Sequence, residues 1–217
     1  MALSDRDLRQ RAFGQDRGPT VVDRFGIFLS ARQIRRAVGS FSGKRVADVG
    51  CGYEARLASS LLPSVGRMLL VDLALAPSLK TDQRVTAIEG FVPEALRAIP
   101  SDSLDVLICN SVLEHLWDPV ETLREFWRLL AAGGVAVINV PSWRGKWFLE
   151  LSAFRLGFSP AEEMDDHKMY YDPKDLWPLL IEAGFRPRDV RCFKHKFGLN
   201  TFARCAKSTT PGAGMLP

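Results

Sequence analysis

Cysteine and histidine are scarce in this chain of 217 residues, which contains four cysteines and three histidines. No two cysteines form a C-x-x-C pair, and the histidines show no ligand spacing with them, so the sequence predicts no zinc module and no metal site. Unpaired cysteines in apolar runs are typical of a reducing compartment, so we expect a cytoplasmic protein. The residues concerned are Cys51, Cys109, Cys192, Cys205, His115, His167 and His195.

Long apolar runs are also missing, since none reaches the roughly 20 residues that a membrane-spanning helix needs. The opening residues, 1–7, are charged and lack the apolar core of a secretory signal. The net charge is +4, with many of the basic residues before residue 46. We interpret this excess as a solvated face, and we expect no nucleic-acid partner because no nucleic-acid-binding module accompanies it. A weak attraction to a membrane surface stays open.

The composition, 47% hydrophobic and 25% charged, is that of an ordinary globular protein, and the length favours one domain. We expect this domain to cover residues 20–206. The polar residues 1–19 predict a loosely held N-terminal arm, and the Gly/Pro/Thr-rich residues 207–217 predict a disordered tail. The aromatic-rich residues 142–171 predict an insertion that acts as a lid over the substrate.

Strand-like and helix-like segments alternate along most of the chain. Short apolar runs predict strands at 45–49, 68–71, 85–89, 104–109 and 135–140. Helical patterns are found at 20–38, 54–62, 94–99, from 119 to the glycine pair at 133–134, and 173–183. Two late strands, 188–193 and 197–206, are close enough to pair as an antiparallel hairpin. This order predicts an α/β fold, a Rossmann-like three-layer sandwich around a mostly parallel sheet.

The stretch Val46-Ala47-Asp48-Val49-Gly50-Cys51-Gly52 is a buried strand that ends in a glycine turn. The glycines let the chain bend sharply and let a ligand approach the backbone. Asp72 follows Gly52 by 20 residues, at the end of the next apolar run. An acidic residue at this spacing holds the ribose hydroxyls in nucleotide-binding βαβ units. The sequence therefore predicts a site for an adenosine-containing cofactor.

Asp48 indicates which cofactor this is. It would repel the pyrophosphate of a dinucleotide, which lies over such a turn, but it would attract the sulfonium and ammonium groups of S-adenosylmethionine. At about 4 Å this interaction is worth roughly 4 kcal/mol of either sign before desolvation. Three alternatives stay open: Asp48 only caps the next helix, the protein is an NAD-dependent oxidoreductase that uses the loose Gly50-x-Gly52-x-x-Ala55 fingerprint, or it is a non-catalytic partner protein.

Four motifs resemble those of class I S-adenosylmethionine-dependent methyltransferases that act on small molecules. They are VADVGCG (46–52), LLVDL (69–73), LDVLICNSVLEHLWDP (104–119) and LLAAGGVAVINVP (129–141), in the order of that family. The resemblance covers residues 20–206. It implies a sheet of about seven strands, one of them antiparallel near the edge, and S-adenosyl-L-methionine as the cofactor.

The resemblance also implies roles in cofactor binding. Side chains or backbone at the strand ends should contact the methionine part, the ribose and the adenine, in that order along the sheet. Many relatives have an aspartate near the adenine after the third strand, but this chain has Phe91, so we expect backbone groups of Phe91 and Val92 there. The implied cofactor residues are Asp48, Gly50, Cys51, Gly52, Asp72, Leu73, Phe91, Val92, Asn110 and Ser111.

The acceptor side is predicted from the ionisable residues in the expected lid. His167 is the first candidate for a base because its unperturbed pKa lies near neutrality, and Tyr170 would orient the acceptor. Alternatively, His167 caps the helix that begins near Asp172, and Glu114-His115 supplies the base. We expect in-line methyl transfer to a hydroxyl oxygen of a small molecule, such as a sugar, a lipid-linked precursor or a quinone-like ring.

Overall fold

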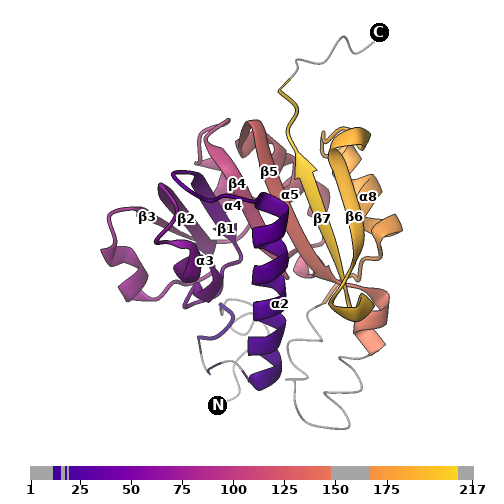
Figure 1. The fold of residues 1–217 in the computed structure, drawn as a ribbon, viewed down its shortest axis with the longest axis horizontal. Coiled ribbons are helices and arrows are strands. Elements are labelled where there is room, and N and C mark those ends of the chain that lie inside the picture. The colour runs from indigo at the N-terminus through magenta and orange to yellow at the C-terminus, as the bar shows by residue number, and fades with distance from the viewer. Residues whose placement is uncertain (1–11, 16–17, 19, 148–166, 210–217) are drawn as a thin grey trace.

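The computed structural model describes residues 12–15, 18, 20–147 and 167–209 (Figure 1). Its centre is a seven-stranded sheet with the strand order β3-β2-β1-β4-β5-β7-β6. The five strands from β3 to β5 are parallel, and β7 pairs antiparallel with both β5 and β6. The strands are β1 Arg45–Val49, β2 Arg67–Asp72, β3 Val85–Glu89, β4 Leu104–Asn110, β5 Leu130–Pro141, β6 Val190–His195 and β7 Asn200–Ala206.

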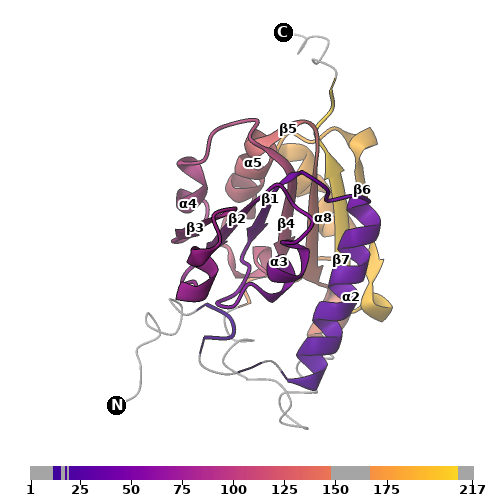
Figure 2. The same cartoon turned by 60° about the vertical axis from the view of Figure 1, so that its left-hand side comes forward.

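Helices cover both faces of this sheet, as Figures 1 and 2 show from two directions. The helices α2 Val21–Val38 and α3 Arg56–Leu61 lie on one face. The helices α4 Glu94–Arg97, α5 Pro119–Leu129 and α8 Pro173–Glu182 lie on the other. The predicted three-layer α/β sandwich and its C-terminal hairpin are therefore confirmed. No helix among the described residues is long and apolar enough to span a bilayer.

Two apolar cores form because alternate side chains of a strand point to opposite faces. On β1, Val46 packs in the core under α2 and α3, whereas Ala47 and Val49 pack in the core under α5 and α8. Asp48 has the same parity as Val46, and its register partner on β4 is Ile108, which belongs to the same core. The alternation therefore places one carboxylate at the edge of an otherwise apolar face.

The boundary between α5 and β5 differs from the prediction. The helix ends at Leu129, and the glycine pair at 133–134, which was expected to end it, lies inside β5. Leu129 and Leu130 are both fully buried, so their apolar character fits a helix and a strand equally well. The register between β4 and β5 shifts between Leu104 and Val106, where the extra residues of β5 are accommodated.

The predicted arm, lid and tail lie largely outside the described residues. Residues 1–11, 16–17 and 19 belong to the expected arm, 148–166 to the expected lid and 210–217 to the expected tail. The limits of these segments stay predictions of the sequence. Of the described parts of the arm and of the lid, residues 12–15 and 167–171 lie close to the site described next.

Candidate functional site

The glycine turn after β1 is held between β2 and the loop after β4. Gly50 and Gly52 have φ angles of 72° and 75°, in the left-handed region that favours glycine. The Gly50 backbone N–H donates a hydrogen bond of 2.8 Å to the carbonyl of Val71. A Cβ atom added at Gly50 would lie 2.0 Å from Cγ2 of Val112. Both the left-handed φ angle and the close approach of Val112 require glycine at position 50.

Replacing Gly50 with alanine should therefore destabilise the fold more than the same change at Gly39. Gly39 shares the left-handed conformation, with a φ angle of 76°, but nothing lies within 4 Å of its added Cβ. The left-handed conformation costs about 1–2 kcal/mol in both variants, and overpacking against Val112 should cost Gly50→Ala about 1–3 kcal/mol more. Urea unfolding measures both values. Equal midpoints for the two variants would contradict the close approach of Val112.

Asp72 connects the ends of β1 and β2. Its Oδ2 atom accepts a hydrogen bond of 2.6 Å from the backbone N–H of Gly52, and Oδ1 accepts one of 2.7 Å from the N–H of Leu73. Burial raises the pKa of Asp72, and these two bonds oppose the shift. Each carboxylate oxygen accepts two hydrogen bonds. The carboxylate can therefore hold the turn and still accept bonds from two neighbouring hydroxyls of a ligand.

Asp48 is a buried carboxylate with an unsatisfied oxygen. Its side chain is 1% exposed, and Oδ2 has no hydrogen-bond partner within the described part of the chain. Burial, and secondly the charge of Asp72, raise the pKa of Asp48 to about 7. Asp48 does not cap the next helix, because the N-cap of α3 is Ala55 and no side chain bonds that end. A cationic ligand would satisfy both the unpaired oxygen and the unfavourable charge.

Part of the expected N-terminal arm lies against the glycine turn. The backbone N–H of Tyr53 donates a hydrogen bond of 2.9 Å to the carbonyl of Phe13, and Ala12 is buried. A Cβ atom on Gly52 would lie 3.1 Å from that carbonyl oxygen. The Phe13 side chain is 50% exposed. Phe13 was not predicted from the sequence to lie at the site, although it is the only aromatic residue among the first 19.

The expected adenine side lies where β2 and β3 end together. The register pairs Asp72 with Glu89, which places Leu73 and Phe91 at the same edge of the sheet. Phe91 is 53% exposed, and Leu73 is half-buried. Glu89 accepts a hydrogen bond of 2.8 Å from the backbone N–H of Leu75 and pairs with Lys80 at 3.1 Å, and both interactions lower its pKa. Glu89 therefore fixes the loop after β2.

The expected methionine side lies at the end of β4. The side-chain oxygen of Asn110 accepts a hydrogen bond of 2.9 Å from the amide of Asn139 on β5. Ser111 has a φ angle of 59°, and its N–H donates a bond of 2.8 Å to the carbonyl of Asn139. The β1–β4 register places Val49 beside Cys109, so Gly50 and Asn110 lie at the same sheet edge. The predicted cofactor residues at the ends of β1, β2 and β4 therefore meet.

His167 and Tyr170 lie together beside a second histidine and a buried glutamate. Nδ1 of His167 is 3.1 Å from the hydroxyl of Tyr170, and its ring centroid is 4.8 Å from that of His115. Glu114 and His115 belong to the 3-10 turn η2, Leu113–His115, and Glu114 is 1% exposed. Helix α8 is capped by Asp172 and Asp175 in a capping box, so His167 does not cap it. The burial of Glu114 was not predicted from the sequence.

Lys196 faces this cluster from the turn between β6 and β7. It lies in the 3-10 turn η4, Lys196–Gly198, and has a φ angle of 48°. Burial lowers the pKa of Lys196 to about 8, and the charge of Glu114 opposes that shift. Burial likewise raises the pKa of Glu114 to about 8. No pattern in the sequence around residue 196 signals this position, because it depends on how the hairpin packs.

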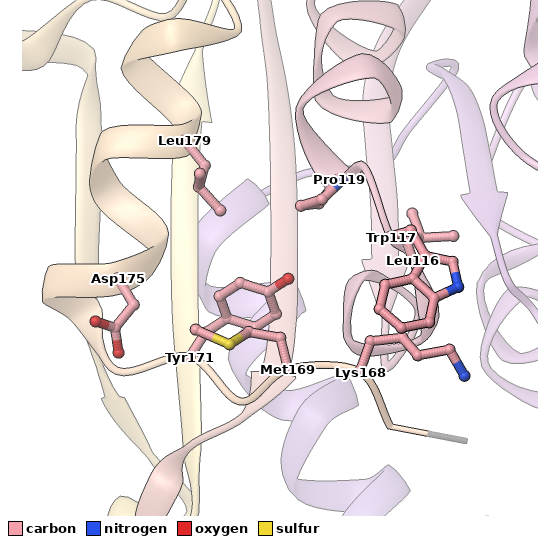
Figure 3. Close-up of a pocket in the computed structure, with 8 residues that line it drawn as sticks. All are labelled: Leu116, Trp117, Pro119, Lys168, Met169, Tyr171, Asp175 and Leu179. Atoms are coloured by element: carbon pink, nitrogen blue, oxygen red, sulfur yellow. The ribbon is translucent and has the colours of Figure 1, made fainter. Parts of the chain in front are cut away.

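A groove of about 450 Å³ runs beside the segment 167–171 (Figure 3). Figure 3 shows Tyr171 between Leu179 of α8 and Pro119 at the start of α5. The ammonium of Lys168 lies 5.5 Å from the ring centroid of Trp117 at one end of the groove. The groove is lined by Leu116, Trp117, Pro119, Lys168, Met169, Tyr171, Asp175 and Leu179, none of which was predicted to bind the cofactor.

Comparisons with known proteins agree with this arrangement. A family model described as a methyltransferase domain matches residues 19–190. The ubiquinone biosynthesis O-methyltransferase of Bordetella bronchiseptica is 35% identical over 169 residues, which are 73% of this chain and 68% of that protein. The protein with the same description from Psychrobacter arcticus is 29% identical over 178 residues, 75% of this chain and 67% of that protein. The chain spans between about half and two thirds of the length of the curated relatives that it matches.

The fold is shared with solved structures as well. The 1,6-didemethyltoxoflavin-N1-methyltransferase of Burkholderia thailandensis, solved with 1,6-didemethyltoxoflavin and S-adenosylhomocysteine bound, has a TM-score of 0.60 and 19% sequence identity. The match covers 84% of this chain and 78% of that one. At this identity the likeness shows the fold alone.

Proposed function

Since the chain belongs to the class I S-adenosylmethionine-dependent methyltransferases, we propose that it transfers a methyl group to a hydroxyl oxygen of a small molecule. The observation that carries the proposal is the buried Asp48 carboxylate, whose Oδ2 atom has no partner in the described part of the chain. Bound S-adenosylmethionine supplies a methyl group on a cationic sulfur. A carboxylate that lacks a counter-charge fits such a ligand and repels a pyrophosphate.

The other cofactor contacts are assigned from the positions of residues along the sheet edge. Asp72 would accept bonds from the ribose hydroxyls, and the backbone of Gly50, Cys51 and Gly52 would pass under the cofactor. Leu73 would pack on the adenine, with backbone groups of Phe91 and Val92 at its edge. Asn110 and Ser111 would lie under the methionine part. The convergence of β1, β2, β3 and β4 at one edge supports these roles.

The acceptor is proposed to lie on the side of His167 and Tyr170. Catalysis requires that the acceptor oxygen is in line with the sulfur–methyl bond and that its proton is removed. The Tyr170 hydroxyl, 3.1 Å from Nδ1, would orient the His167 ring, and His167 would assist the loss of the proton. The names of the curated relatives favour a quinone-like or phenolic ring. A sugar or a lipid-linked precursor is the other class that the sequence predicts.

Calorimetry with purified protein tests the cofactor. We expect S-adenosylhomocysteine to bind and NADH neither to bind nor to compete with it, because Asp48 and Asp72 would repel the pyrophosphate. Absence of heat at high micromolar ligand, for protein shown to be folded by circular dichroism, would count against the proposal. Binding of NADH alone would favour the oxidoreductase alternative.

Transfer from labelled S-adenosylmethionine to phenols, catechols, sugars and lipid-linked precursors then tests the acceptor. Labelled product from one class identifies it, whereas cofactor binding without transfer to any of them would favour the non-catalytic alternative. A cytoplasmic location, the lack of a nucleic-acid partner and peripheral membrane contact stay predictions of the sequence.

A further inference from the structure

We propose that the ammonium group of Lys196 donates a hydrogen bond to the reacting oxygen of the acceptor, and that it thereby selects phenols over sugars and other alcohols. Lys196 lies in the η4 turn, at the edge of the sheet where β5 ends. It is not among the residues that the sequence predicted for catalysis or for cofactor binding. The assignment rests on the proposed function, because it concerns the second substrate of the same methyl transfer.

Contacts with the chain after β5 fix the position of the η4 turn. The backbone N–H of Ser142 donates a hydrogen bond of 2.9 Å to the carbonyl of Leu199, and the Ser142 hydroxyl donates one of 2.6 Å to the carbonyl of Gly198. Ser142 is fully buried, so water does not compete for these bonds. A Cβ atom on Gly145 would clash with the carbonyl oxygen of Leu199. The turn is therefore held closely against the end of β5.

The backbone of the η4 turn is strained at two consecutive residues. The φ angles of Lys196 and Phe197 are 48° and 59°, in the left-handed region that residues with a Cβ atom rarely adopt. Phe197 gains no burial from this conformation, since its side chain is 81% exposed, whereas Lys196 is half-buried. Strained residues of this kind cluster at functional sites. The turn thus combines unfavourable backbone angles with a partly buried lysine.

The Lys196 ammonium lies beside helix α2 without a direct partner. Its Nζ atom is 3.6 Å from the position that a Cβ atom on Gly26 would take, so a residue larger than alanine at position 26 would displace it. Glu114 acts on Lys196 through its charge, but no carboxylate oxygen of the described residues lies within 4.0 Å of Nζ, and the ammonium donates no hydrogen bond to them. A buried donor without an acceptor is unfavourable. An oxygen of a bound acceptor would satisfy it.

The ammonium keeps its positive charge at neutral pH. Burial lowers the pKa of Lys196 to about 8, so the group is still mostly protonated at pH 7. The titratable groups that face it are Glu114 from the η2 turn and His195, the preceding residue on β6. The charge of Glu114 favours the protonated lysine, and the lysine in turn lowers the pKa of His195. A charged donor in a fixed position stabilises an oxygen on which negative charge develops.

The methyl transfer that follows uses this charge on the acceptor oxygen. The hydroxyl proton passes to the imidazole of His167, the oxygen forms a bond to the methyl carbon, and the carbon–sulfur bond breaks with its electron pair staying on sulfur. Lys196 keeps its own proton and donates it to the oxygen as a hydrogen bond throughout. Phenols have a pKa of about 10, and sugars and other alcohols are much weaker acids. One ammonium therefore brings the ionisation of a phenol close to neutral pH but leaves that of an alcohol far above it.

The absorbance of para-nitrophenol tests the assignment without any methyl transfer, because the phenolate is yellow and the phenol is colourless. We expect the full-length protein, with S-adenosylhomocysteine and EDTA present, to lower the pKa of the bound probe by about 1 or more. Lys196→Met should abolish this change, and Lys196→Arg, which retains the positive charge, should keep most of it. Lys194→Met is the matched control, since Lys194 is exposed on β6 and pairs with Asp172 at 3.1 Å, and it should act on the probe as the wild type does.

Circular dichroism checks folding, and Lys196→Gln replaces Lys196→Met if that variant does not fold. An unchanged probe pKa with the wild type, or equal changes in Lys196→Met and Lys194→Met, would overturn the assignment. In the transfer assay the wild type should methylate phenols at least about tenfold faster than sugars, and Lys196→Met should lose this preference. Binding of S-adenosylhomocysteine without an effect on the probe rejects only the role of Lys196. An effect on the probe in protein that does not bind S-adenosylhomocysteine rejects the methyltransferase proposal and leaves a phenolate site.

Discussion

Replacing Asp72 with alanine should weaken the binding of S-adenosylhomocysteine about 100-fold or more. The variant would lose the proposed acceptor for two ribose hydroxyls, and it lacks the carboxylate that holds the N–H groups of Gly52 and Leu73 at 2.6 and 2.7 Å. Hydrogen bonds to a charged group contribute about 1.5–3 kcal/mol each, so two of them correspond to at least a factor of about 100 in affinity. Calorimetry at neutral pH measures this loss directly.

Asp105→Ala is the matched control for this variant. Asp105 also accepts a bond from a backbone N–H, that of Arg45, at 2.8 Å, and it pairs with the Arg45 guanidinium at 2.7 Å. It lies near the beginning of β4, at the end of the sheet opposite to the glycine turn. Asp105→Ala should lose stability and keep its affinity. An Asp72→Ala protein that binds as tightly as this control would refute the ribose role.

Replacing Asp48 with asparagine should have the second largest effect, and one that depends on pH. In the wild type the affinity for S-adenosylmethionine should rise from pH 6 to pH 8, because the carboxylate has a pKa of about 7 without ligand and attracts a cation only when ionised. In Asp48→Asn we expect no such rise and an affinity about 10–100-fold lower at pH 8. Calorimetry in buffers of different ionisation enthalpy should show proton release near pH 7 for the wild type alone.

The same substitution should have the opposite effect on the stability of the ligand-free protein. The pKa of Asp48 is about 7 in the folded state and near 3.8 when exposed, so the folded state retains a proton that the unfolded chain loses. The resulting stabilisation is complete below pH 3.8 and is lost as the pH rises to 7, at about 1.4 kcal/mol per pH unit at most. The neighbouring titratable groups are Asp72 and the thiols of Cys51 and Cys109.

Urea unfolding at pH 5 and pH 8 measures this dependence. Asp48→Asn should unfold at a higher urea concentration than the wild type at pH 8, and the difference should be about 2–3 kcal/mol smaller at pH 5, because about two of the pH units over which the wild type loses stability lie between pH 5 and pH 7. If the two proteins lose the same stability between these pH values, Asp48 is not the buried acid that the structure indicates. The expected result, a more stable Asp48→Asn at pH 8, would also show that a residue proposed to bind the ligand reduces the stability of the unliganded fold.

The cofactor edge could be predicted from the sequence because it depends on local patterns. Strand β1 has the bounds that the sequence predicts, Arg45–Val49, and parallel strands bring their carboxyl ends to one edge. Asp48, Asp72 and Asn110 therefore meet once the strands are recognised. Their individual hydrogen bonds could not be predicted, since Asn110 bonds Asn139 across a register that only the folded sheet defines.

The acceptor side was predicted less completely because it depends on contacts between distant segments. His167 and Tyr170 could be proposed from their chemistry, but the approach of Glu114 and His115 to His167 requires the backbone bonds between the η2 turn and residues 168–169. The position of Phe13 against the glycine turn depends in the same way on a single hydrogen bond to Tyr53. The spacing of apolar and polar residues along the sequence does not predict contacts between such distant segments.

The antiparallel strand β7 begins where β5 ends, so a late part of the chain lies at the edge of the sheet where the proposed site is. Since His195 on β6 lies opposite Asn200 on β7, and Pro141 of β5 pairs with Asn200, the η4 turn lies at the edge where β5 ends. In the proposed assignment, residues before 112 supply the contacts to the cofactor, and residues after 113 supply those to the acceptor. With this proposed division, substitutions after residue 113 would change the acceptor and leave the methyl donor the same.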